Sequence, residues 1–262
     1  MSFFAAPEPV CRPCDGAIEV VIRPKEKDLG GFSVRRVLPS ADRRSVGPFV
    51  FFDHMGPAVF PPGAGIQVRP HPHIGLATLT YLFEGEIMHR DSLGYIQPIR
   101  PGAVNLMTAG SGIVHSERAG EDLDRTSRLN GIQTWMALPE DKQELDPEFT
   151  HYPADQLPSF EVGPAAVTVV MGSAYGATSP VHQQSPTLYL AIGLPAGEAV
   201  ELPGDYAEWA AYVVAGAVEV GDEHCETHTM AVSGNGPAAR VEAQEDARLI
   251  VVGGDPLGPR RM

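Results

Sequence analysis

Short runs of apolar residues, many of them alternating with polar residues, recur along the whole chain between turns rich in Gly and Pro. A period of two is typical of strands that bury one face, and no long stretch shows the period of an amphipathic helix. Only residues 139–145 favour a helical turn, and residues 53–65 are expected to form a loop. The pattern predicts an all-β protein with strands at residues 17–22, 32–38, 49–52, 76–83, 86–90, 103–107, 131–137, 166–171, 187–192, 210–214, 229–232 and 248–252.

The predicted strands form two groups, divided within residues 139–164, where Pro and acidic residues replace the apolar pattern. In the first group, a strand, a turn at Gly85 and a second strand resemble the strand, Gly216 turn and strand of the second group. This repetition indicates two copies of one β unit. We assign them to domains at residues 1–145 and 146–262.

Composition narrows the class of protein. With 262 residues, 43% of them hydrophobic, the chain is long enough for one large β domain or two of ordinary size. The net charge of −14 argues against a protein that binds nucleic acid directly. The N-terminus has no basic, apolar leader and no apolar run could span a membrane, so we expect a cytoplasmic protein without membrane contact.

The chain has three cysteines, and this odd count favours reduced thiols. Cys11 and Cys14 form a CxxC motif that could be half of a zinc site, whereas Cys225 stands alone. Because half a site is weak support for metal binding, structural or incidental cysteines are the preferred interpretation.

Two short motifs carry the strongest chemical signal, His-Pro-His at residues 71–73 and His-Ser-Glu at residues 115–117. Each places two metal-binding side chains two positions apart, and side chains so spaced point to the same face of a strand. Two neighbouring strands could therefore direct three imidazoles and one carboxylate at a single point. Such a set suits a first-row transition metal, and its groups would be costly to bury together without one.

The first motif resembles that of the cupin superfamily, in which a Gly, here Gly65, precedes His-x-His and a turn Gly, here Gly85, follows. A Glu that usually follows the second His by four or five residues is absent, and Glu117 can supply the carboxylate instead. With this departure the chain resembles the pirin family. The matching segments cover residues 46–49, 53–57, 71–75, 84–86, 89–94, 107–110, 112–117 and 254–258.

This resemblance implies an all-β bicupin of two β-barrel (jelly-roll) domains with one metal, usually iron, in the first barrel. By the matching motifs, its ligands are His71, His73, His115 and Glu117, and Fe(II) is the expected metal. The second domain is expected to bind none, because it has no His-x-His motif. Relatives usually continue into a C-terminal segment that ends in a helix, so a truncated or different tail stays open for this chain.

The resemblance also implies a quercetin 2,3-dioxygenase, which uses O₂ to open the central ring of a flavonol and releases carbon monoxide. Glu117 is then the catalytic base that takes the proton of the flavonol 3-hydroxyl. A small aromatic substrate and O₂ are the expected partners, and a monomer is expected because the barrels close their own edges. The predicted substrate pocket is lined by Phe52, His54 and Met107, with Phe49, Phe51 and Met55 as further candidates.

Two other interpretations stay open. The chain could be a metal- or redox-sensing regulator that binds a transcription factor, as the mammalian relative does, or a metabolic enzyme. It could also be a metalloenzyme that acts on another small aromatic compound. An apolar cavity above the metal would favour an enzyme, and an outer docking patch would favour a regulator.

The remaining histidines are weaker candidates for chemistry. His89 is expected to hydrogen-bond Asp91 or Ser92 in a structural role. Four others fit surface positions, namely His151, His182, His224 and His228.

Overall fold

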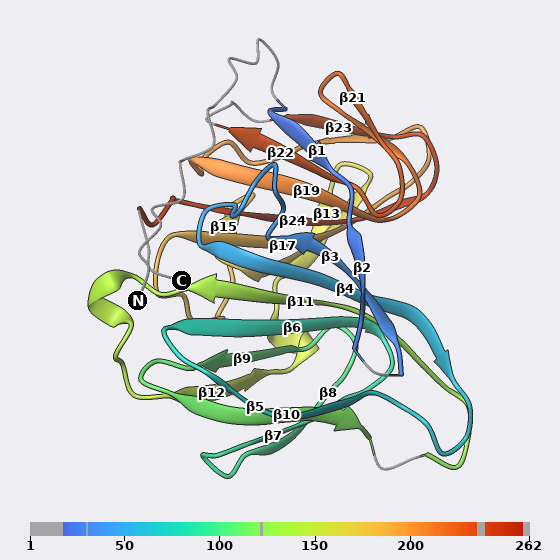
Figure 1. Ribbon diagram of the computed structural model, residues 1–262. Coiled ribbons are helices and arrows are strands. Elements are labelled where there is room, and N and C mark those ends of the chain that lie inside the picture. Colours follow the sequence, from blue (N-terminus) through green and yellow to red (C-terminus); the bar gives the residue numbers. More distant parts are fainter. Residues whose placement is uncertain (1–17, 30, 121–122, 235–238, 259–262) are drawn as a thin grey trace.

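The computed structural model describes residues 18–29, 31–120, 123–234 and 239–258 (Figure 1). Apart from two short 3-10 helices at Glu140–Lys142 and Ala154–Gln156, the regular elements in this part of the chain are strands. The predicted all-β class is therefore confirmed. The described residues contain no helix that is long and apolar enough to cross a membrane.

Two sheets make up the first barrel. The large sheet has seven strands, in the order β12 (Glu148–Tyr152), β9 (Val104–Thr108), β6 (Leu76–Glu84), β11 (Ser127–Ala137), β4 (Phe49–Phe60), β3 (Ser33–Leu38) and β2 (Lys25–Asp28). The small sheet has four, in the order β5 (Gln67–His73), β10 (Ile113–Ala119), β7 (Ile87–Asp91) and β8 (Ile96–Ile99).

The second barrel repeats this division. Its large sheet has seven strands, in the order β1 (Val20–Ile22), β22 (Met230–Gly234), β19 (Glu208–Ala215), β24 (Ala247–Gly254), β17 (Thr187–Leu194), β14 (Ala165–Met171) and β13 (Ser159–Val162). Its small sheet has four, in the order β18 (Ala199–Glu201), β23 (Arg240–Ala243), β20 (Val218–Val220) and β21 (Glu223–Cys225). A short hairpin, β15 (Ser173–Ala174) with β16 (Ala177–Thr178), completes the strands.

The two large sheets pack against each other in the middle of the molecule, and Figure 1 shows the small sheet of the first barrel at the far lower side. One apolar cluster joins Phe52 and Leu79 of the first large sheet to Tyr189 and Tyr212 of the second. Burial of this apolar surface is what holds the two halves together.

The interiors of the two barrels differ. In the second barrel, a single apolar cluster fills the space between its sheets and includes Trp209, which is only 1% exposed. The first barrel has two smaller apolar clusters, and its buried residues include His73, His89, His115 and Glu117. The first barrel is therefore the one that offers a polar interior.

Two expectations about boundaries were wrong. Residues 53–60, expected to form part of a loop, continue β4, because β3 and β11 pair with this strand on both sides. Sheet membership also departs from a division between residues 145 and 146. β12 lies after that point yet pairs with β9 of the first large sheet, and β1 pairs with β22 of the second. The backbone N–H and C=O groups of these strands pair with segments far away in the sequence, and a local pattern does not reveal such partners.

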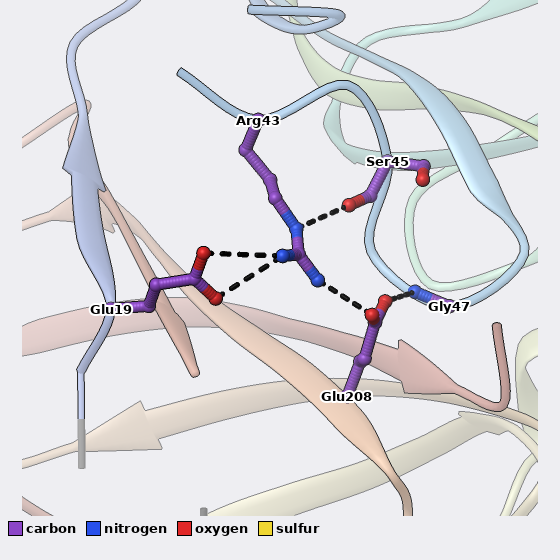
Figure 2. A network of polar contacts seen from close by, with 5 residues as sticks. All are labelled: Glu19, Arg43, Ser45, Gly47 and Glu208. Atoms are coloured by element: carbon purple, nitrogen blue, oxygen red, sulfur yellow. Dashed lines mark hydrogen bonds and ion pairs between the residues drawn. The ribbon is translucent and has the colours of Figure 1, made fainter. Parts of the chain in front are cut away.

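A polar network fastens the loop before β4 to the second barrel (Figure 2). Arg43 Nη2 lies 2.6 Å from Glu208 Oε1 on β19, and Arg43 Nη1 lies 3.1 Å from Glu19 Oε2. The backbone N–H of Gly47 donates to the other carboxylate oxygen of Glu208 at 2.7 Å, and Arg43 Nε donates to the carbonyl of Ser45. Because the Arg43 and Glu208 side chains are only 13% and 16% exposed, water screens this pair weakly.

Candidate metal centre

Three histidines of the small sheet gather inside the first barrel. His71 and His73 lie two positions apart on β5, and His115 lies on the neighbouring strand β10. His71 is the direct cross-strand neighbour of His115, whereas His73 is paired with Ile113. Because side chains two positions apart share a face, this register brings the three rings together.

The ring nitrogens form a compact donor set. One nitrogen from each of the three histidines lies within 4.8 Å of the other two. Nε2 of His73 lies 3.1 Å from Nε2 of His115. A metal–nitrogen distance of about 2.1 Å places two ligands that meet at a right angle about 3 Å apart. This pair therefore already has the spacing of two ligands of one ion.

Burial prepares these imidazoles for metal binding. Desolvation, with a smaller contribution from repulsion by His71, lowers the pKa of His73 to about 4 and that of His115 to about 2. Both rings are therefore neutral at neutral pH, which is the form that binds a metal. On His71, Nδ1 lies 2.8 Å from the carbonyl oxygen of Arg69, so Nδ1 carries the proton and Nε2 is available. This donor set fits a divalent transition metal.

Glu117 lies two positions after His115 on β10 and is buried. Nε2 of Gln133 on β11 donates to both of its carboxylate oxygens, at 2.7 and 2.8 Å. The hydroxyl of Thr80 on β6 lies 3.4 Å from Oε1. The carboxylate is thus held toward the large sheet and is not among the three clustered donors. Its role as a fourth ligand stays a prediction.

Two aromatic rings of the large sheet form a wall beside the histidines. Phe51 and Trp135 stack with ring centroids 3.9 Å apart and planes at 8°. The Trp135 ring also meets His73 nearly at a right angle, with centroids 4.9 Å apart. The guanidinium of Arg36 covers Phe51 at 4.4 Å and is fixed by two hydrogen bonds to Asp53. The Phe51 ring therefore lies between Arg36 and Trp135, and Trp135 adjoins the candidate metal ligands.

Comparison with known proteins shows the family of this chain. Residues 31–136 match the pirin family model, and residues 189–262 match the model of the pirin C-terminal cupin domain. The chain belongs to the pirin family. One cupin domain therefore lies in each half, which confirms the predicted bicupin.

Several pirin relatives extend over most of this chain. A pirin-like protein of Caulobacter vibrioides is 49% identical over 93% of this chain and 85% of its own length. A candidate quercetin 2,3-dioxygenase of Pseudomonas aeruginosa is 39% identical over 87% of this chain and 72% of its own length. The crystal structure of a quercetin 2,3-dioxygenase from Acinetobacter baumannii has a TM-score of 0.85 at 36% identity, covering 91% of this chain and 79% of that one.

In this pirin, two of the three predicted pocket residues lie elsewhere. The Phe52 ring lies 4.9 Å from that of Tyr212, and Nδ1 of His54 lies 2.9 Å from the Tyr212 hydroxyl. Both side chains are therefore buried between the barrels, on the face of β4 opposite to Phe51. Alternation along the strand explains the correction, because a shift of one residue exchanges the two faces.

The other candidates for the substrate pocket lie in different apolar clusters. Met107 is buried with Ile113 and Phe149, so it faces the interior of the first barrel, and its place in a substrate pocket stays a prediction. Met55 belongs to a different apolar cluster of that barrel, and Phe49 to the cluster between the barrels. Of the larger set, Phe51 is the residue that reaches the aromatic wall.

Sequence reasoning missed Gln133 and Trp135. Both lie on β11, two positions apart, and the alternation of residues 131–137 would have placed them on one face. The expected hydrogen bond of His89 to Asp91 is confirmed, at 2.8 Å. His182 and His224 are exposed as expected.

Two other histidines are not simply on the surface, since both are half-buried. Nδ1 of His151 lies 2.5 Å from Oδ1 of Asn105, and the His228 ring lies 5.2 Å from that of His54. Cys225 is buried, and burial raises the pKa of its thiol to about 11. The CxxC motif of Cys11 and Cys14 lies outside the described residues.

Proposed function

We propose that this pirin is a metal-dependent dioxygenase that opens the central ring of a flavonol such as quercetin. The observation that carries the proposal is the aromatic wall of Phe51 and Trp135 beside three clustered imidazoles. A flat ring system could lie against the half-buried Trp135 with a hydroxyl directed at the ligand cluster. The 36% identity to a solved quercetin 2,3-dioxygenase supports the same reaction class.

His71, His73 and His115 would hold the metal, with Glu117 as the proposed fourth ligand, and Fe(II) is the expected ion. When bound, the ion would supply Lewis acidity that lowers the pKa of a phenolic hydroxyl and would enable reaction with O₂. His73 and His115 would bind the ion through uncharged imidazole nitrogens, because burial has already lowered the pKa of both rings.

Glu117 is the proposed base for the flavonol 3-hydroxyl. Its carboxylate lies inside the barrel and is oriented by the amide of Gln133. A carboxylate so held could accept the phenolic proton on one oxygen while the other remains bound to the amide. Trp135 and Gln133 are half-buried, so a substrate could approach this side of the barrel from solvent.

The experiment is to purify the protein without added metal, measure bound metal by elemental analysis and follow quercetin absorbance under O₂. We expect about one metal per chain and loss of the flavonol absorbance with release of carbon monoxide. His73→Ala should lose both properties, whereas His224→Ala, at an exposed position of the second barrel, should keep both.

One metal per chain without turnover of quercetin would refute the flavonol proposal and retain the metal site. Activity toward other small aromatic compounds would then support the broader metalloenzyme. Metal-dependent capture of a transcription factor or an enzyme would support the regulator. No bound metal, even after addition of Fe(II), would refute the metal centre itself.

A further inference from the structure

A second buried carboxylate lies behind the candidate metal centre. His89 on β7 is 2% exposed, and its Nδ1 lies 3.4 Å from Nδ1 of His115. Its Nε2 lies 2.8 Å from Oδ2 of Asp91, which is the cross-strand neighbour of His115. Asp91, His89 and His115 thus form a continuous row of polar atoms that ends at Nε2 of His115, 3.1 Å from Nε2 of His73.

The Asp91 end of this row is anchored by the backbone. Its Oδ1 accepts hydrogen bonds from the N–H groups of Leu93 and Tyr95, at 2.9 and 3.1 Å. Both donors belong to the turn between β7 and β8, so the hairpin itself fixes the carboxylate. With its side chain 0% exposed, Asp91 directs the remaining oxygen at His89.

The His89 ring is held in its plane as well. It stacks on Phe149 with ring centroids 4.2 Å apart and planes at 16°. The ring of Tyr95 in turn packs against Phe149, with centroids 5.2 Å apart. Packing against Phe149 therefore sets the plane of the His89 ring. Within that plane, the contacts of Nε2 with Asp91 and of Nδ1 with His115 define which ring nitrogen faces which partner.

The direction of the hydrogen bonds follows from the chemistry of each group. A carboxylate oxygen accepts, so Nε2 of His89 donates to Asp91, and Nδ1 of His89 is the atom that can accept a hydrogen bond from His115. The facing Nδ1 of His115 must then carry its own proton, although 3.4 Å is long for a hydrogen bond. This leaves the lone pair of His115 on Nε2, toward His73. The Arg69 carbonyl imposes the same tautomer on His71.

We infer that Asp91 and His89 are positioning residues of the metal centre, which hold His115 in the tautomer that leaves Nε2 open for metal. The inference rests on the metal site of the proposed function but not on its substrate. It also assigns His89 more than the structural role that its sequence context suggests.

Two variants separate the chain of hydrogen bonds from simple packing. His89→Phe keeps an aromatic ring against Phe149 and removes both nitrogens. Asp91→Asn keeps the side-chain size, but either amide orientation sets an N–H against an existing donor: His89 Nε2–H, or the backbone N–H groups of Leu93 and Tyr95. If the proton of His89 moved to Nδ1 in response, two N–H donors, Nδ1 of His89 and Nδ1 of His115, would face each other.

The measurement is the affinity for Co(II), by competition with a chelator, on the metal-free full chain. Both variants should bind about 10–100-fold more weakly than the native protein, with a changed visible spectrum of bound Co(II). The matched control is His224→Phe, which breaks a similar pair with Glu219 on the exposed surface of the second barrel. It should bind Co(II) with native affinity.

The tautomers can also be read in the native protein, whatever the folding of the variants. Imidazole ¹⁵N shifts in the Zn(II)-loaded protein should show a protonated Nδ1 on His115 and a protonated Nε2 on His89. Native affinity in both variants, or the opposite tautomer on either ring, would overturn the inference. Weakened Co(II) binding in a protein without quercetin turnover would support the inference while refuting the flavonol proposal.

Discussion

The hydroxyl of Tyr212 lies 2.9 Å from Nδ1 of His54, across the boundary between the two barrels. Nε2 of His54 lies 2.7 Å from Oδ1 of Asn130, so both ring nitrogens have partners. His54 is 0% exposed, and desolvation lowers its pKa to about 4. A neutral imidazole is therefore part of the contact between the barrels.

His54 makes stability depend on pH. In the unfolded chain its pKa returns to about 6.5, so the unfolded state binds more protons as the pH falls. The stability contribution is thus complete above about pH 6.5 and is lost as the pH falls toward about 4. Between about pH 7.5 and about pH 4.5, the native protein should lose about 2–3 kcal/mol more unfolding free energy than His54→Gln. Urea unfolding in the presence of a chelator measures this difference.

The control for this pH dependence is His224→Gln, because His224 is exposed and pairs with the surface residue Glu219. It should follow the native profile. An identical loss of stability in the native protein and in His54→Gln would show that His54 is not held neutral.

Removal of the Arg43 guanidinium should weaken the attachment of the loop before β4. Arg43→Met keeps much of the apolar stem but deprives two carboxylates, Glu19 and Glu208, of the hydrogen bonds of Figure 2. We expect a loss of about 2 kcal/mol in unfolding free energy, because the groups are largely buried. Arg240→Met breaks an exposed pair with Glu242 and should cost under about 0.5 kcal/mol. Similar costs for both variants in urea unfolding would contradict the role of the network.

Trp135 should report metal binding through its fluorescence. Its ring lies 4.9 Å from that of His73, whereas Trp209 is buried in the second barrel. A paramagnetic ion such as Co(II) at the histidine cluster should quench Trp135 much more strongly than Trp209. The chain has these two tryptophans, so Trp135→Phe should abolish most of the quenching and Trp209→Phe should preserve it. The reverse result would place the ion away from the first barrel.

Glu117→Gln tests the base. The substitution keeps one oxygen for the amide of Gln133 but removes the charge that would accept the phenolic proton. Quercetin turnover should fall by about 10²–10⁴-fold, while elemental analysis still finds bound metal. Glu219→Gln, on the surface of the second barrel, is the control and should turn over at the native rate. If Glu117→Gln also matched the native rate, the proton would have another acceptor.

The all-β class and the common face of His71 and His73 could be predicted because both depend on local periodicity. His71 and His73 share a face through their spacing alone, and the pairing of β5 with β10 then brings His115 opposite His71. Phe52 and His54 were misplaced for the opposite reason. Residues 49–52 are apolar in both phases, since β4 buries one face inside the first barrel and the other against the second.

The strand-rich class, the repeated β unit and the residue types able to bind a metal follow from the order of amino acids alone. Which strands lie opposite one another follows from how the whole chain folds. That choice set Gln133 against Glu117, Trp135 beside His73 and Asp91 beside His115. The physical reason is that a strand's own period fixes the face of each side chain, whereas its neighbours are set by pairing and barrel closure between segments far apart in the chain.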